Sequence, residues 1–171
     1  MPKNSDSVAA LIEDWHRERP DLDPSSLGIV GRMARLSAHI TRRAEQWLAP
    51  LGLSWESFSL IVTLRRAGAP YQLRPGELLQ VSLLTSGAIT NRIDRVEQQA
   101  LVVRLRDPND RRGVIVQLTP EGLELADRAI ALHFAQLEAL LAPLSKNENE
   151  IAARVLGKLL SSLEQGAPGD R

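Results

Sequence analysis

The chain has 171 residues, of which 43% are hydrophobic and 25% charged, a composition typical of one globular domain with or without helical extensions. It has no cysteine, which excludes a disulfide scaffold, a thiolate zinc site and a cysteine nucleophile. Its 21 basic and 21 acidic residues give zero net charge, which argues against a partner bound through gross positive charge. No apolar run approaches the roughly 18 residues of a membrane span, and the first residues lack the apolar stretch of a signal peptide, so we expect a cytoplasmic protein with no membrane partner.

The first third of the chain predicts a short helix followed by a long one. The short helix covers residues 8–19 and ends at Pro20, where a turn-rich connector begins. Ser25 and Ser26 are the candidate caps of the long helix, which residues 50–52 close. The apolar residues of the long helix are spaced by three or four, as on one helix face. They are Leu27, Val30, Met33, Leu36, Ile40, Ala44 and Trp47.

Two shorter helices are predicted next. Ser54 caps the first of them, which ends at Gly68. The second has Pro75 at its first helical position and Glu77 in its first turn, where an acid interacts favourably with the helix dipole. The apolar positions of the first are Phe58, Ile61, Val62 and Leu64.

A further helix is predicted over residues 86–99, with Thr85 or Ser86 as its cap. Its apolar and polar residues fall on different faces. The buried stripe is Ile89, Ile93 and Val96. The outward positions are Thr90, Asn91, Asp94 and Arg95.

The pattern then changes from the helical period to the alternation of strands. Residues 101–105 and 114–118 predict the two strands of a hairpin, which a polar loop over residues 106–113 joins. In the first strand the apolar and basic residues alternate, with Val103 and Leu105 opposite Arg104 and Arg106.

The last third of the chain predicts two more helices. Residues 119–121 read as a cap, a proline and an acid, which together start a long helix. Residues 143–147 separate it from the last helix. The apolar stripe of the long helix is Leu123, Ala126, Ile130, Phe134, Leu137, Leu141 and Leu144, and that of the last helix is Ile151, Val155, Leu159 and Leu163.

Three helices followed by a two-stranded hairpin predict a mainly α protein built around a winged helix-turn-helix. A recognition helix fits the major groove of DNA, and a basic hairpin beside it reaches the adjacent minor groove or the backbone. All six cations of residues 85–112 are arginines, whose planar fork suits phosphates and base edges. A solvated, salt-bridged face is the simpler interpretation of such a run. The residues that we expect to contact DNA are Ser86, Thr90, Asn91, Arg95, Arg111 and Arg112.

The flanking helices predict a homodimer, because their apolar stripes exceed what a small domain covers. We assign residues 1–50 to dimerisation and support, residues 51–120 to DNA binding and residues 121–171 to dimerisation. A twofold dimer would place two recognition helices about one DNA turn apart, so its site on double-stranded DNA would be pseudo-palindromic. One enlarged monomeric bundle is the alternative.

The sequence resembles the MarR family of bacterial transcription regulators over nearly its whole length. The segments that carry the resemblance are residues 83–97, 101–104, 107–114 and 118–122. The wing segment, Asp-Pro-Asn-Asp-Arg-Arg-Gly-Val, is the most specific of them. The resemblance implies a winged-helix regulator of transcription in which Asp110 positions Arg112 on DNA.

Two positions depart from the pattern of that family. The family usually has glycine after the recognition helix, where this chain has Gln99 and Ala100. Because a left-handed alanine is strained by about 1 kcal/mol, we expect the helix to end differently. A serine or threonine usually stands at Arg74 as a helix cap, and its loss costs about 1 kcal/mol. Neither change removes a DNA contact.

Trp15 and the segment after it resemble the branch of the family that responds to urate and related aromatic anions. That branch has a tryptophan on an added N-terminal helix, an aspartate before the reading motif and two arginines. Trp15, Arg92 and Arg104 fall on the tryptophan and the arginines, whereas Ser59 stands at the aspartate position. The resemblance therefore implies a small aromatic or phenolic anion other than urate, stacked on the indole and paired with guanidinium. The alternative is that Trp15 is an interface aromatic and that both arginines bind phosphate or nearby acids.

An enzyme and a helical interaction module are the competing classes. His16, His39 and His133 lie on separate predicted helices without metal-ligand spacing, and no phosphate-binding loop or nucleophile elbow occurs. We therefore expect no catalytic residue, no metal and no cofactor. A helical adaptor leaves the wing arginines unexplained, and a DNA-binding module without a ligand stays open. A DNA affinity that falls steeply with salt would distinguish DNA binding from an adaptor.

Overall fold

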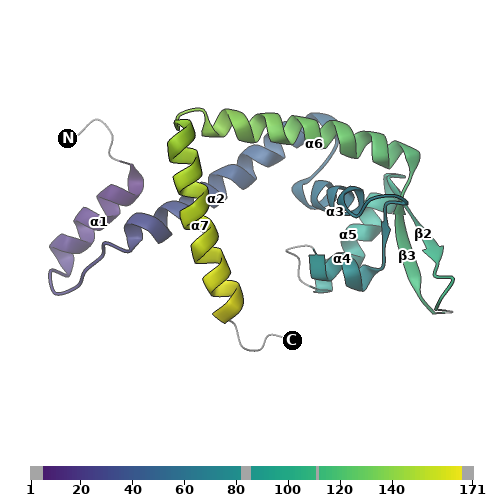
Figure 1. The fold of residues 1–171 in the computed structure, drawn as a ribbon, viewed down its shortest axis with the longest axis horizontal. Coiled ribbons are helices and arrows are strands. Elements are labelled where there is room, and N and C mark those ends of the chain that lie inside the picture. Colours follow the sequence, from purple (N-terminus) through teal and green to yellow (C-terminus); the bar gives the residue numbers. More distant parts are fainter. Residues whose placement is uncertain (1–5, 82–85, 111, 167–171) are drawn as a thin grey trace. The chain divides into compact units, whose positions relative to one another are not determined.

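The computed structural model describes residues 6–81, 86–110 and 112–166, which form mostly helices and one small sheet (Figure 1). In chain order the elements are α1 (Ser7–Glu18), α2 (Leu27–Leu48), the 3-10 helix η1 (Ala49–Leu51), α3 (Trp55–Arg66), β1 (Gln72–Leu73), α4 (Pro75–Val81), α5 (Ser86–Gln98), β2 (Val102–Arg106), β3 (Val114–Leu118), α6 (Pro120–Leu141) and α7 (Lys146–Gly166). They form two compact units, which meet within α6 between Ala129 and Ile130. The first unit contains α3, α4 and α5 followed by the β2–β3 hairpin, which confirms the predicted winged helix-turn-helix.

The sheet has three antiparallel strands in the order β1–β3–β2. Strands β2 and β3 pair along their whole length, from Val102 opposite Leu118 to Arg106 opposite Val114. The short strand β1 pairs with β3 through Leu73, which lies opposite Val116. The sequence analysis missed β1, because two residues are too few for an alternation to be recognised. Through β1, the segment that leads into α4 is tied to the hairpin.

The core of the first unit lies where α3, α5 and the sheet meet (Figure 1). The predicted buried stripe of α5 is confirmed, since Ile89, Ile93 and Val96 are all buried. The largest fully buried side chains are Leu48, Leu60, Ile61, Leu64, Leu78, Ile93, Val96, Val102 and Val116. Because these apolar side chains pack one face of α5, they fix which residues the opposite face presents outward.

Two of the predicted helix starts are confirmed. The hydroxyl of Ser54 accepts a hydrogen bond from the backbone N–H of Ser57 at 3.1 Å, as a cap of α3 should. At the start of α4, the carboxylate of Glu77 accepts the backbone N–H of Arg74 at 2.7 Å. This is the acidic half of a capping box, and it satisfies one free N–H of the helix without a serine or threonine.

The predicted cap of α2 is wrong. Ser26 has helical backbone angles, and its side chain caps no backbone N–H among the described residues. A turn of the connector takes its place, since Leu27 donates its N–H to the carbonyl of Pro24 at 3.0 Å. The carboxylate of Asp23 holds this turn by accepting the N–H of Ser25 at 2.9 Å.

Helix α5 ends at a left-handed residue, Ala100, whose φ is 58°. Its N–H donates to the carbonyl of Glu97 at 2.8 Å, and the next N–H, of Leu101, donates to Val96 at 3.1 Å. This is the pair of bonds by which a glycine usually closes a helix, so the expectation of a different ending is wrong. The hydroxyl of Thr119 donates to the Ala100 carbonyl at 2.8 Å and helps to hold the turn. Ala100 therefore carries a strain of about 1 kcal/mol that glycine would not.

The alternation predicted for β2 holds, but its apolar face is the exposed one. Val103 is 39% exposed and Leu105 is 42% exposed. Arg104, on the other face, is half-buried and points its guanidinium toward acidic side chains of α5. The sheet therefore meets α5 through a charged contact as well as an apolar one.

Large apolar side chains are exposed on the flanking helices of both units. In the first unit they are Leu11 and Trp15 of α1 and Ile29, Val30, Met33, Leu36 and Ile40 of α2. In the second unit they are Phe134, Leu141, Ile151, Val155, Leu156, Leu159, Leu160 and Leu163, with Leu144 exposed in the segment between α6 and α7. Within each unit, so many exposed large apolar side chains favour a surface that a partner covers. No single helix in the described ranges is long and apolar enough to cross a membrane, although the pair Leu27–Leu51 and Trp55–Arg66, bent by 79°, meets the length and composition requirement when taken together.

Candidate nucleic-acid interface

The polar face of α5 is exposed, as the sequence predicts for a recognition helix. Thr90, Asn91 and Arg95 all lie on the solvent side, opposite the buried stripe that fixes the helix. Ser86 is the first residue of α5, and its side chain lies outside the described residues. The described part of this face therefore offers a hydroxyl, a carboxamide and a guanidinium, which are the groups that read base edges and bind phosphates.

The tip of the β2–β3 hairpin is a tight loop over residues 107–113, called the wing loop below. Asp110 shapes it by accepting the backbone N–H of Arg112 on its carboxylate and that of Gly113 on its carbonyl, both at 2.9 Å. Gly113 has no room for a side chain, because a Cβ there would lie 2.8 Å from the Cβ of Asp107. Asp110 thus orders the backbone at Arg112 rather than pairing with its guanidinium. The predicted DNA-binding residue Arg111 lies outside the described residues.

An ion pair that the sequence analysis missed joins the wing loop to the start of α4. The Nε of Arg74 donates to Oδ2 of Asp107 at 2.5 Å, although 33 positions separate the two residues. The Asp107 side chain is 0% exposed, whereas that of Arg74 is 48% exposed. The Arg74 guanidinium, followed by the backbone N–H of Asn109, holds the pKa of Asp107 below its ordinary value. Asp107 is therefore a buried carboxylate that stays ionised at neutral pH.

Arg104, which was predicted to bind a ligand, is paired with acids of the recognition helix. Its guanidinium donates to Asp94 at 2.5 Å and also to the carboxylate of Glu97. Its backbone N–H donates to Glu97 as well, at 3.3 Å. Strand β2 and helix α5 are therefore locked together by charge, and an anion that reached Arg104 would compete with two carboxylates.

Arg92 lies on α5 beside the start of α3. The charges of Arg92 and Arg95 contribute to holding the pKa of Glu56 below its ordinary value, after the larger effects of the backbone N–H of Glu56 and the hydroxyl of Ser54. The Nη1 atom of Arg92 is buried and has no hydrogen-bond partner in the described part of the chain. One nitrogen of the Arg92 guanidinium therefore has no hydrogen-bond partner among the described residues.

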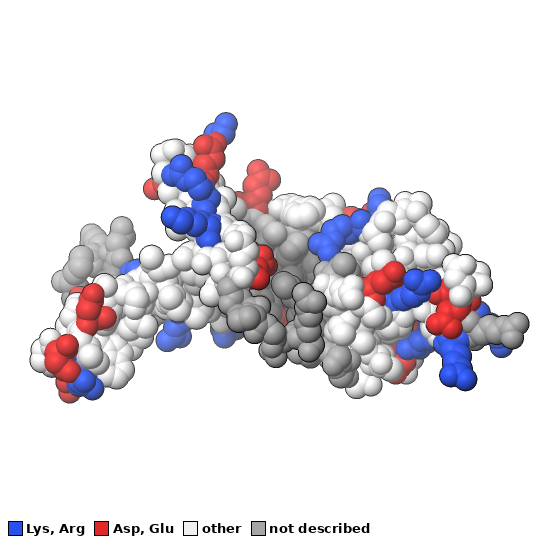
Figure 2. All heavy atoms as spheres, turned by 60° about the horizontal axis from the view of Figure 1, so that its bottom comes forward, with Lys and Arg blue, Asp and Glu red and all other residues white. Residues whose placement is uncertain are grey.

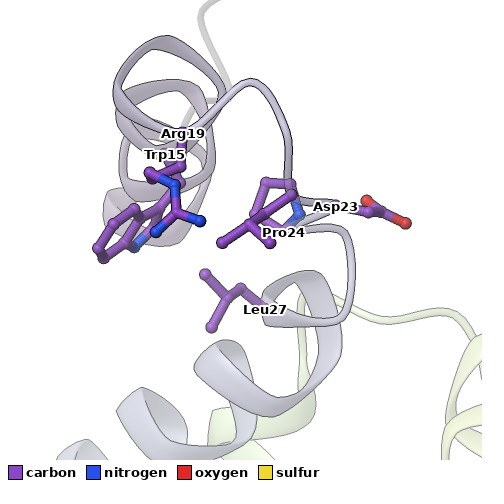
Figure 3. Close-up of a pocket in the computed structure, with 6 residues that line it drawn as sticks. Trp15, Arg19, Asp23, Pro24 and Leu27 are labelled. Carbon is purple, nitrogen blue, oxygen red and sulfur yellow. The ribbon is translucent and has the colours of Figure 1, made fainter.

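Trp15 lines a surface hollow of about 200 Å³ at the junction of α1 and α2, together with Arg19, Leu22, Asp23, Pro24 and Leu27. Figure 3 shows Trp15, Arg19, Pro24 and Leu27 pointing toward one another, while the Asp23 carboxylate points away. Trp15 as a whole is 47% exposed. Ser59 is half-buried on α3 and does not line this hollow. The described chain thus does not bring Trp15 together with Ser59, Arg92 and Arg104 in one site.

Acidic and basic side chains are mixed around the winged helix-turn-helix (Figure 2, right side). Some of the basic side chains there, such as Arg74 and Arg104, are paired with acids. Net charge alone therefore does not show which surface binds DNA. Three arginines of α5, β2 and the wing loop are exposed and form no ion pair with a described residue. They are Arg95, Arg106 and Arg112.

The described part of the chain holds no metal-binding cluster. No group of three histidine, aspartate or glutamate side chains there could hold a metal ion. His16, His39 and His133 lie on three separate helices, α1, α2 and α6.

Residues 53–114 match the MarR family. This segment includes α3, α4, the recognition helix α5, β2 and the wing loop. The HTH-type transcriptional regulator PecS of Dickeya dadantii (strain 3937) is 33% identical over 152 residues, which are 89% of this chain and 92% of that protein. The chain belongs to the MarR family.

Two further proteins match over most of their length. The HTH-type transcriptional repressor YetL of Bacillus subtilis (strain 168) is 27% identical over 84% of this chain and 85% of its own. The crystal structure of a cysteine-to-serine mutant of MarR from E. coli, complexed with operator DNA, superposes with a TM-score of 0.68 at 28% identity, over 85% of this chain and 97% of that one. This MarR-family chain is therefore a DNA-binding transcriptional regulator, built as a winged helix-turn-helix.

Proposed function

We propose that the chain is a homodimeric repressor that holds a pseudo-palindromic operator and releases it when a small aromatic or phenolic anion binds. The observation that carries DNA binding is the exposed polar face of α5 beside a wing loop whose Arg112 guanidinium has no partner among the described residues. Asn91 and Thr90 read base edges, and Arg95 and Arg112 bind the phosphates or the minor groove. Ser86, Asp110 and Arg111 complete the DNA-binding set.

Dimerisation is supported by the exposed apolar faces of the flanking helices. Val30 is 63% exposed and Leu36 is 59% exposed on α2, and Leu163 is 72% exposed on α7. Burying such side chains between two protomers removes apolar surface from water at about 25 cal/mol per Å². A twofold dimer then presents two α5 helices to successive turns of one face of the duplex. Repression is the output that the name of the relative YetL supports.

The DNA that flanks the gene of this protein is the substrate for the first test. We expect the purified chain to protect an inverted repeat there, with half-sites about one helical turn apart. Affinity should fall steeply with salt, since each neutralised phosphate releases counterions. The measurement is nuclease footprinting together with binding isotherms at several salt concentrations. A chain that stays monomeric, or that ignores every duplex at low ionic strength, would contradict the proposal.

A ligand is supported by two separate features of the first unit. Arg92 has a buried, unused Nη1 on the helix that reads DNA, and an anion would supply its missing partner. The Trp15 hollow of about 200 Å³ exceeds the roughly 150 Å³ cavity that holds one benzene ring. An indole stacks on flat ligands and a guanidinium pairs with an anion, so the Trp15 hollow favours an aromatic ligand and Arg92 favours an anionic one. Ser59 at the position of the aspartate disfavours urate itself.

Release of DNA requires that the ligand prefer a dimer that fits DNA poorly, because a ligand shifts an equilibrium only by its differential affinity. Arg104 is one residue through which a ligand would change the structure, because its ion pairs with Asp94 and Glu97 hold β2 against α5. An anion near Arg92 would alter the balance of charge on the same helix. The spacing or tilt of the two recognition helices would then change.

The ligand is tested with a panel of benzoates, hydroxybenzoates, phenols and urate in a DNA mobility-shift assay. We expect at least one non-urate aromatic anion to release the operator. In the variant Trp15→Ala that compound should lose its effect, and Glu13→Ala, an exposed charged position on the same helix, serves as the matched control. Because Trp15 also belongs to the exposed apolar face of α1, the oligomeric state and the DNA affinity without ligand are measured for both variants. A panel that leaves every complex intact would leave the chain as a DNA-binding regulator without a ligand, and would overturn this part of the proposal.

A further inference from the structure

One buried carboxylate organises the base of the wing loop. Oδ1 of Asp107 accepts the backbone N–H of Asn109 at 2.8 Å. The backbone N–H of Asp107 donates to the carbonyl of Gly113 at 3.0 Å, so the two ends of the loop are bonded to each other. The loop that carries Arg112 is thus built around Asp107.

The other oxygen of Asp107 leaves the loop and meets the helix-turn-helix. Oδ2 accepts the Nε–H of Arg74, the residue just before α4, at 2.5 Å. Because the Asp107 side chain is 0% exposed, this bond is shielded from water on the aspartate side and is stronger than a surface ion pair. The wing loop is therefore fastened to the start of α4 by a charged contact in addition to the pairing of β1 with β3.

Arg74 is itself held in place. Its backbone N–H is bound by Glu77 at 2.7 Å, and its Nη1 lies 3.7 Å from the other oxygen of the same carboxylate. A short chain of contacts thus runs from the first turn of α4 through Arg74 to Asp107 and the loop. The family usually has a serine or threonine at Arg74, whose short side chain has no guanidinium to offer Asp107.

We propose that Arg74 is a positioning residue for DNA binding, which fixes the wing loop relative to the helix-turn-helix and so directs Arg112 at the duplex. The inference rests on the proposed DNA contact of Arg112. Fixing a loop before binding removes the entropy cost of ordering it on DNA. Arg74 acts through Asp107 and not by touching DNA itself.

The test is a double-mutant cycle between Arg74→Ser and Arg112→Ala, measured as operator affinity over a range of salt concentrations. Serine restores the usual cap at the start of α4, but it removes the guanidinium from Glu77 and from Asp107 and leaves the buried Asp107 carboxylate without its charged partner. We therefore expect a lower melting temperature, and operator binding is measured well below it. We expect Arg74→Ser alone to weaken operator binding about tenfold, and to have almost no further effect once Arg112 is alanine. Arg74→Lys, which keeps a charge that can reach Asp107, should recover part of the affinity.

Hydrogen exchange gives a readout that does not depend on DNA. In Arg74→Ser the amide of Asn109, which is bound to Asp107, should exchange faster, while the amides shared by β2 and β3 keep their protection. Unchanged exchange at Asn109 would overturn the inference.

Two binding outcomes would also overturn it. If Arg74→Ser and Arg112→Ala weaken binding independently and Arg74→Ser lowers the salt dependence in both backgrounds, Arg74 contacts a phosphate directly. If Arg74→Ser binds like the unaltered chain while Arg112→Ala does not, the wing contacts DNA but needs no anchor. Failure of the proposed function looks different, because then the unaltered chain fails to bind an operator or Arg112→Ala has no effect.

Discussion

Replacing Arg112 with alanine is expected to weaken operator binding about 100-fold and to leave the oligomeric state unchanged. The residue is exposed, its guanidinium pairs with no described acid, and its backbone N–H is held by Asp110 at 2.9 Å. One arginine contact to DNA contributes about 1–3 kcal/mol, and a dimer loses two of them. Since each 1.4 kcal/mol is a factor of ten, two losses near the lower end of that range give the expected change. Fluorescence anisotropy with a labelled operator measures it.

The matched control is Arg43→Ala, which removes the same charge from an exposed position on α2. If DNA were bound only through the long-range attraction between the positive charges of the protein and the phosphates, both variants would show the same small loss of operator affinity. We expect Arg112→Ala to lose far more, and to reduce the dependence of log affinity on log salt by about two, one for each lost contact. Equal affinities for the two variants would remove the wing loop from the DNA interface.

The winged helix could be predicted from the sequence because each of its elements has a local signal. The stripe of Ile89, Ile93 and Val96 has the helical period, and residues 114–118 are a short, mostly apolar run that predicts a strand with the bounds that β3 has in the structure. Local periodicity reports which face of an element is buried, and burial decides these elements. The outward residues of α5 follow from the same pattern. Most of the candidate DNA-binding residues could therefore be predicted from the sequence.

The polar contacts between different helices and strands could not be predicted from the sequence. Arg74 and Asp107 are 33 positions apart, and neither residue has a neighbour in sequence that signals the pair. Arg104 looks like a free guanidinium in the sequence, but the folding of β2 onto α5 places it beside Asp94 and Glu97. Charged side chains carry no periodic signal for their partners, because a salt bridge depends on tertiary geometry. The sequence therefore offered two interpretations of Arg104, a ligand contact or a pair with nearby acids, and it did not show that Asp94 and Glu97 are those acids.

The end of α5 shows a different limit. Propensity argues against a left-handed alanine, yet Ala100 adopts a φ of 58°. Two backbone hydrogen bonds close the helix there, and the Ala100 carbonyl is bound by Thr119 at 2.8 Å. A local cost of about 1 kcal/mol is small beside the packing that places β2 against α5. Tertiary structure thus overrides the preference of one residue, and only coordinates reveal where.

The same turn makes Gly122 the glycine, among those whose surroundings the structure describes, where one added methyl group should lower stability most. A Cβ at Gly122 would lie 1.9 Å from the carbonyl oxygen of Leu101 and 2.8 Å from its carbonyl carbon. That oxygen already accepts the N–H of Thr119 at 3.1 Å, so it cannot move away without breaking the bond that joins the end of α5 to the start of α6. We expect Gly122→Ala to lower the free energy of unfolding by about 3 kcal/mol or more, at the upper end of what overpacking costs. Urea denaturation measures this loss.

Gly157 in α7 provides the matched control, because a Cβ there would meet nothing within 4 Å. In that helix interior, Gly157→Ala should raise stability by up to about 1 kcal/mol through helix propensity alone. The two substitutions add the same methyl group and should therefore change stability in opposite directions. If Gly122→Ala is tolerated as well as Gly157→Ala, α6 does not lie against the turn at Leu101 in solution. The contact between Gly122 and the Leu101 carbonyl would then not help to hold the recognition helix in place. The start of α6 would have to lie farther from the end of α5.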